Sequence, residues 1–186
     1  MIPTPPPRPP FDRDRFRALV HYVCHAAPRP EALGATKLNK ILLFSDREAY
    51  LRFGHSLTGE TYVKRQHGPV PRHGQATISE LECSGVLRVT RSSEAFVQTR
   101  YESLEAPKRG VFTDAERVLV DEQIDLICHH HTARSISALS HDAAWERAEM
   151  GEEIPYHSVY ERFFRPPSEA SKAWAQDFLH RFDKSA

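Results

Sequence analysis

The 186-residue sequence has little of what marks a secreted or membrane-spanning protein. It contains three cysteines, an odd number spaced far apart, which argues against a disulfide framework and favours a reducing compartment. No apolar run approaches the ~18 residues that a membrane span requires, and the proline-rich start does not resemble a signal peptide. We therefore expect a cytoplasmic protein with no membrane partner.

Signatures of catalysis are also missing. None of the eight glycines belongs to a phosphate-binding loop of the type G-x-x-x-x-G-K-[ST]. No nucleophile elbow or cysteine-protease signature surrounds Cys24, Cys83 or Cys128. Histidines have the chemistry of a general base, but no group in a recognised catalytic arrangement accompanies them. The sequence therefore predicts no enzyme, no catalytic residue and no cofactor.

The run Cys128-His129-His130-His131 contains metal-ligating residue types. Structural zinc needs about four ligands, usually in spaced pairs, and this run offers no such pairs. On a helix, adjacent residues point about 100° apart, so these four side chains cannot converge on one ion. We expect no metal site here, and interpret the histidines as residues favoured at the C-terminus of a helix.

The net charge is zero, but the charges are segregated along the chain. Residues 1–59 carry nine Lys and Arg against five Asp and Glu, whereas residues 112–162 carry four against eleven. Indiscriminate nucleic-acid binding needs a sustained basic face. A basic front and an acidic back suit contact with another protein better.

Hydrophobic periodicity predicts an α+β, mainly helical fold of about six to eight helices. We expect a single domain over residues 11–165, after a proline-rich leader at 1–10 and before a C-terminal helix at 166–186 that packs on the domain. The expected helices include residues 11–25, 37–53, 71–84, a helix that starts in a capping box at Thr113 and Glu116, and short helices near 135–139 and 140–148.

Three short segments have the composition of β-strands, at residues 61–67, 86–90 and 95–101. We expect them to form one three-stranded antiparallel sheet. Pro71 is expected as the first residue of helix 71–84, because the amide that proline lacks would be unpaired there. The order of helix 37–53, strand, helix 71–84 and hairpin gives this middle part a winged-helix-like arrangement.

Three motifs occur in order along the chain. Residues 37–45 read KLNKILLFS, residues 66–70 read QHGPV, and residues 139–145 read LSHDAAW. They resemble, in this order, the K-L-x-K helix, the G-P-V turn and the S-x-H-x-x-x-W segment of the Panacea, or SocA-like, antitoxin domain. The resemblance covers roughly residues 15–160, although His67 stands where the family often has an aromatic residue.

The resemblance implies an antitoxin that neutralises a toxin encoded nearby by direct contact. In at least one lineage of the family the antitoxin also delivers its toxin to a Clp-type protease. We expect Lys37 and Lys40 to be solvated, as exposed lysines usually are, or alternatively to present a basic patch. We expect Trp145 to anchor the core and His141 to bond a loop carbonyl. The candidate partner-binding residues are Lys37, Lys40, His67, Gly68, Pro69, Val70, His141 and Trp145.

A second class of function stays open. In a winged helix, helix 71–84 would be the recognition helix and the hairpin would be the wing. The candidate DNA-binding residues of this alternative are Arg72, His73, Gln75, Arg88 and Arg91. Against it, the helix also carries Glu80 and Glu82, and a pI near 7.2 gives little general attraction to phosphate.

Overall fold

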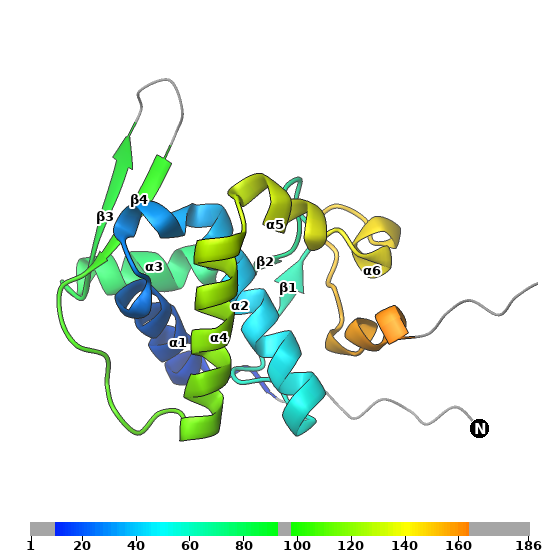
Figure 1. Ribbon diagram of the computed structural model, residues 1–186, viewed down its shortest axis with the longest axis horizontal. Coiled ribbons are helices and arrows are strands. Elements are labelled where there is room, and N and C mark those ends of the chain that lie inside the picture. Colours follow the sequence, from blue (N-terminus) through cyan, green and yellow to red (C-terminus); the bar gives the residue numbers. More distant parts are fainter. Residues whose placement is uncertain (1–9, 93–97, 164–186) are drawn as a thin grey trace, which may run out of the picture.

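The structure is a computed structural model that describes residues 10–92 and 98–163 (Figure 1). It is mainly helical with small antiparallel sheets, so the expected α+β class is confirmed. The expected C-terminal helix and the proline-rich leader up to residue 9 lie outside the described residues. The helices are α1 (Arg13–Ala26), α2 (Pro30–Phe53), α3 (Gly74–Cys83), α4 (Asp114–His130), α5 (Ala133–Leu139), α6 (Ala143–Arg147) and the 3₁₀ helix η1 (Tyr156–Phe163).

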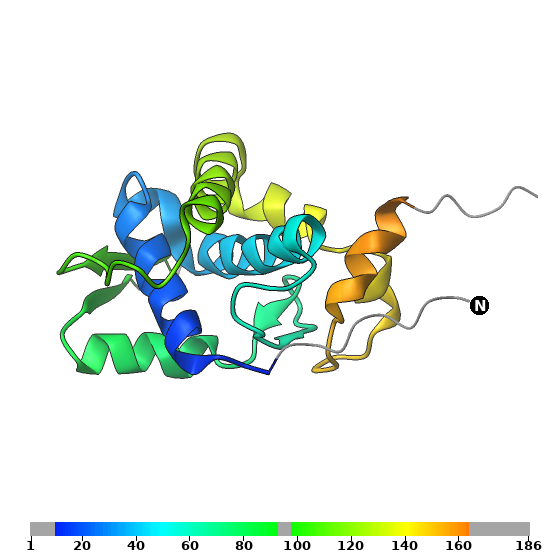
Figure 2. The same cartoon turned by 90° about the horizontal axis from the view of Figure 1, so that it is seen from below.

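Helix α2 lies at the centre of the fold, between α1 and α4 (Figures 1 and 2). Its sequence has apolar residues around most of its circumference, and eleven of its residues are buried, as a central helix requires. The helix begins at Pro30, earlier than expected, and Gly34 breaks its regular geometry with a φ of +61°. Glycine adopts this conformation without steric penalty.

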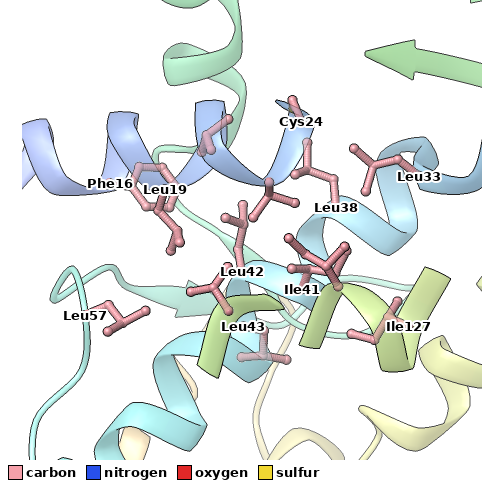
Figure 3. Packing of buried hydrophobic residues seen from close by; sticks show 14 of the residues in the cluster. Phe16, Leu19, Cys24, Leu33, Leu38, Ile41, Leu42, Leu43, Leu57 and Ile127 are labelled. Carbon is pink, nitrogen blue, oxygen red and sulfur yellow. The ribbon is translucent and has the colours of Figure 1, made fainter. Parts of the chain in front are cut away.

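The hydrophobic core gathers where α1, α2 and α4 meet (Figure 3). Phe16 and Leu19 enter from α1, Leu38 and Ile41 from α2, and Ile127 from α4. Each of these side chains is at most 1% exposed, and full burial of one such side chain stabilises a fold by about 1.5–3 kcal/mol. None of the helices that the structure describes is long and apolar enough to cross a membrane.

The expected three-stranded sheet is wrong, because the strands form two separate pairs. Of the strand expected at residues 61–67, only two residues form β1 (Tyr62–Val63). The chain then turns at Gly68 and Pro69 and returns as a second strand that pairs with β1. Pro71 therefore lies in a strand instead of starting a helix. The pairs are β1 (Tyr62–Val63) with β2 (Val70–Pro71), and β3 (Leu87–Ser92) with β4 (Gln98–Ser103).

The outer edge of β1 is occupied by the region after α6, not by the β3–β4 hairpin. Val63 forms a bridge with Glu153, and the Ile154 amide donates to the Tyr62 carbonyl at 2.8 Å. The Lys64 amide donates to the Glu152 carbonyl, also at 2.8 Å. Segments about ninety residues apart in the sequence therefore fix the β1–β2 hairpin in place.

A buried carboxylate fixes the loop that leads from α2 into β1. Asp46 of α2 is fully buried and accepts hydrogen bonds from the Thr58 amide at 3.0 Å, the Thr58 hydroxyl at 2.8 Å and the Tyr62 hydroxyl at 2.8 Å. Burial raises the pKa of Asp46 to about 6, although these hydrogen bonds favour the ionised form. These hydrogen bonds hold Thr58 and Tyr62 in place, so the loop leads into β1 along one path.

The N-terminus of α4 forms the expected capping box. The Thr113 hydroxyl accepts from the Glu116 amide at 3.3 Å, and the Thr113 amide donates to the Glu116 carboxylate at 2.8 Å. The other Glu116 oxygen pairs with Arg15 of α1 at 2.7 Å. A cap that is visible in the sequence therefore also joins two helices.

We predict that Asp46→Asn lowers the free energy of unfolding by about 1–3 kcal/mol, because an amide nitrogen replaces an oxygen that accepts buried hydrogen bonds. Urea unfolding measures this loss. The control is Asp125→Asn, since the Asp125 side chain is 71% exposed and its change should stay within about 0.5 kcal/mol. Equal stability of the two variants would contradict the role given to Asp46.

Candidate functional site

Lys40 is an interior residue of α2. It is 1% exposed, and its Nζ donates a hydrogen bond to the Pro69 carbonyl at 2.8 Å. No carboxylate of the described residues forms an ion pair with it. Burial lowers the pKa of Lys40 to about 7, and the nearby positive charge of Arg47 adds to this effect. The turn after β1 therefore covers an ammonium group that has little other stabilisation.

Gly68 brings the same turn against two other segments. Its φ is +93°, a conformation that favours glycine. A Cβ atom at this position would overlap both the Lys40 Nζ and the Ser140 hydroxyl. Ser140 is fully buried and donates its own hydrogen bond to the Ser137 carbonyl at 2.7 Å. Helix α2, the hairpin turn and the end of α5 thus meet at one point, which we call the Gly68 joint.

Further contacts attach the hairpin to residues 137–148. The Ser137 hydroxyl donates to the His67 carbonyl at 2.8 Å, and the Trp145 indole donates to the Arg65 carbonyl at 3.2 Å. Both acceptors are backbone carbonyls, so these two hydrogen bonds constrain the backbone of the turn and do not depend on which side chains it carries. In Figure 1, α5 lies beside the β1–β2 hairpin, as these contacts require.

Trp145 forms a stack at the edge of the joint. The His141 ring lies parallel to the indole, with 3.7 Å between ring centroids and 3° between planes. The Lys64 ammonium lies 4.2 Å from the indole centroid and donates to the Ala148 carbonyl at 3.0 Å. Trp145 is only partly buried and lies outside the hydrophobic core, so it ties α6 to the hairpin without the expected place in the core.

His141 does not form the expected bond to a loop carbonyl. Its Nε2 atom is buried and has no hydrogen-bond partner among the described residues. Burial lowers the pKa of His141, the positive charges of Lys40, His67 and Lys64 lower it further, and Glu146 opposes them. These effects favour the neutral imidazole, and its stacking on Trp145 fixes its orientation.

A comparison with known protein families places the chain in one of them. The model of a family described as antitoxin SocA-like, Panacea domain, matches residues 38–146, which is more than half of the chain. The chain belongs to this family. The matched region runs from α2 to α6 and includes the Gly68 joint. The search of curated proteins and the search of solved structures gave no match.

The Panacea motifs converge in space, although about a hundred residues separate the ends of the matched region. Two of the candidate partner-binding residues make other contacts. Lys37 donates to the carbonyl of Cys128 at 3.2 Å, and Val70 pairs with Val63 in the hairpin. Because Lys40 is buried, the expected basic patch of Lys37 and Lys40 does not form.

The residues of the DNA-binding alternative have mixed surroundings. Arg72 and Gln75 are exposed at the start of α3. His73 is engaged internally, because its ring lies 3.0 Å from a Glu60 carboxylate oxygen and stacks on Phe11. Two ion pairs neutralise the arginines of the wing: Arg88–Glu102 at 2.7 Å and Arg91–Glu82 at 3.8 Å. Such pairing leaves little positive charge for a phosphate backbone.

The Cys-His-His-His run ends α4. Cys128 is buried, whereas His129 and His130 are exposed. The His131 ring hydrogen-bonds the Ser135 hydroxyl at 3.2 Å. Within residues 10–92 and 98–163, no group of three or more ligating residues that could hold a metal ion is present.

Sequence reasoning missed the roles of Ser140 and Lys64. Ser140 stands in the third motif, so its position was visible, but its approach to Gly68 exists only after folding. Lys64 was counted as a residue of an ordinary strand, although it contacts the Trp145 ring and the backbone after α6. A lysine four residues before Gly68 gave no separate signal.

We predict that Gly68→Ala destabilises the protein by about 1–3 kcal/mol more than Gly85→Ala, because the new methyl group overpacks the joint. Gly85 is the matched control, since its φ is also positive at +75° and nothing lies within 4 Å of its virtual Cβ. Thermal and urea unfolding of both variants test this. Similar losses would show that the joint has room for a side chain.

A second prediction concerns pH. The pKa of Lys40 is about 7 in the folded protein and about 10.4 in an unfolded chain, so the unfolded chain binds more protons between these pH values. The contribution of Lys40 to the free energy of unfolding should therefore rise with pH, by at most about 1.4 kcal/mol per unit.

Lys40→Met lacks this titration. We expect the free energy of unfolding of the wild type, minus that of Lys40→Met, to increase from about pH 7 to about pH 9. Lys108→Met is the control, because Lys108 is exposed and its difference should stay flat. A difference for Lys40→Met that does not change with pH would contradict the buried, weakly basic amine.

Proposed function

We propose that this chain is a non-catalytic antitoxin that acts in the cytoplasm by binding a cognate protein toxin directly. The observation that carries the proposal is the match of the antitoxin family to residues 38–146. The position of the motif residues supports it. Lys40, Gly68 and Pro69 are buried, so they serve to hold the hairpin against residues 137–148 and not to touch a partner.

A catalytic role for the joint is disfavoured by its packing. Ser140 and the weakly basic Lys40 both approach Gly68, which makes the pair resemble a Ser-Lys dyad in composition. However, Ser140 is 0% exposed and its hydroxyl donates to a backbone carbonyl. Lys40 likewise donates to the Pro69 carbonyl. A substrate has no access to either group, which supports a role in binding.

The test is co-expression of the chain with each product of the adjacent genes, with growth as the readout. We expect one of these products to arrest growth, and the chain to restore it and to co-purify with that product at equal stoichiometry. Because binding consumes one antitoxin per toxin, rescue should require at least equal amounts of the chain. Rescue at far lower amounts would point to turnover, by an enzyme or by an adaptor that delivers successive toxin molecules to a protease. Absence of any toxic neighbour would overturn the proposal.

The same assay distinguishes occlusion from delivery to a protease. In cells that lack Clp-type proteases, rescue by occlusion should persist with a stable toxin level. Rescue by delivery should fail, and the toxin should accumulate in those cells while it disappears in cells that contain the protease.

A further inference from the structure

An open groove lies on the outer side of the Gly68 joint. It has a volume of about 420 Å³, and its walls come from the hairpin turn, the start of α2 and α5. Ala133 and Ala138 give it an apolar floor. The polar groups that line it are His67, Arg134, Ser137 and His141, together with Thr36. No carboxylate is among the lining residues.

The Arg134 guanidinium of this groove has no counter-charge in the described part of the chain. Arg134 and His67 are exposed, and neither side chain forms a hydrogen bond or ion pair with another described residue. Most surface arginines elsewhere do form ion pairs, as in Arg13–Glu80, Arg15–Glu116, Arg52–Glu122, Arg88–Glu102 and Arg117–Asp114. Among the described residues, Arg29, Arg65, Arg72 and Arg109 also lack an ion pair, so what marks this groove is an unpaired guanidinium beside an apolar lining that contains no carboxylate.

His141 adds a second feature to the same place. Its Nε2 atom is buried and lacks a partner among the described residues. A buried polar atom that has no hydrogen bond is unfavourable, because it has lost its bonds to water without replacement. A partner that brings a hydrogen-bonding group into the groove would remove this penalty on binding.

We infer that this groove is the toxin-binding surface and that it takes an acidic segment of the toxin, with carboxylates at Arg134 and His67 and small apolar side chains over Ala133 and Ala138. The inference rests on the proposed antitoxin function and adds the surface and the chemistry of the partner. Charge complementarity of this kind sets association rate and specificity, and it weakens as salt rises.

Charge reversal tests the inference. The probe is the adjacent gene product that the chain neutralises, and calorimetry at low and high salt gives its dissociation constant. We expect Arg134→Glu to weaken binding by at least about tenfold and to reduce the salt dependence, as loss of an interfacial charge pair does. The matched control is Arg109→Glu, an exposed arginine between β4 and α4, which should stay within about twofold.

A photo-crosslinking residue gives a second readout that does not depend on affinity. Placed at Ala138, an exposed residue of the groove, it should crosslink to a toxin peptide rich in Asp and Glu. Placed at Lys108, it should not crosslink. Crosslinking to a neutral or basic peptide would overturn the acidic chemistry.

The outcomes distinguish an error in the groove from an error in the antitoxin function. If the complex forms and growth is rescued, but Arg134→Glu binds as the wild type does and Ala138 gives no crosslink, the groove is wrong and the antitoxin function stands. If the chain neither rescues growth nor forms a complex with any neighbour, both the proposed function and the groove are overturned.

Discussion

The hydrogen bond between the Lys40 ammonium and the Pro69 carbonyl is the contact on which the rest of the site depends. A charged group inside a protein is strongly unfavourable unless it is paired or neutralised, and the described residues offer this one no carboxylate. Two features compensate: the pKa is lowered to about 7, and the hairpin turn covers the amine. The turn can approach so closely because residue 68 has no side chain, and this approach in turn fixes Ser140 and the end of α5.

Other contacts keep the hairpin in register with this amine. At its entrance, Asp46 accepts hydrogen bonds from Thr58 and Tyr62. At its outer edge, β1 pairs with residues 152–154, so the chain after α6 returns to cover it. The hairpin therefore packs between the central helix and the acidic final third of the described chain. The interior motif residues hold the hairpin in this place, whereas residues such as His67 and Arg134 above it are exposed.

The motif residues and the residues of the groove differ in burial. In this chain the motif residues Lys40, Gly68 and Pro69 are buried, whereas Arg134, which belongs to none of the three motifs, is exposed beside them. A scaffold held together by buried contacts tolerates changes on its surface, because exposed substitutions usually alter stability by less than about 0.5 kcal/mol.

The sequence by itself determined the helical α+β class, the central place of α2, the capping box at Thr113 and the family, because periodicity, capping and short motifs are local signals. Only the tertiary structure decided that β1 pairs with Val70 and Glu153, that Lys40 is buried, and that His141 stacks on Trp145. Strand pairing and burial depend on residues far away in the chain. A lysine one turn from another lysine looks solvated until the turn that covers it is in place.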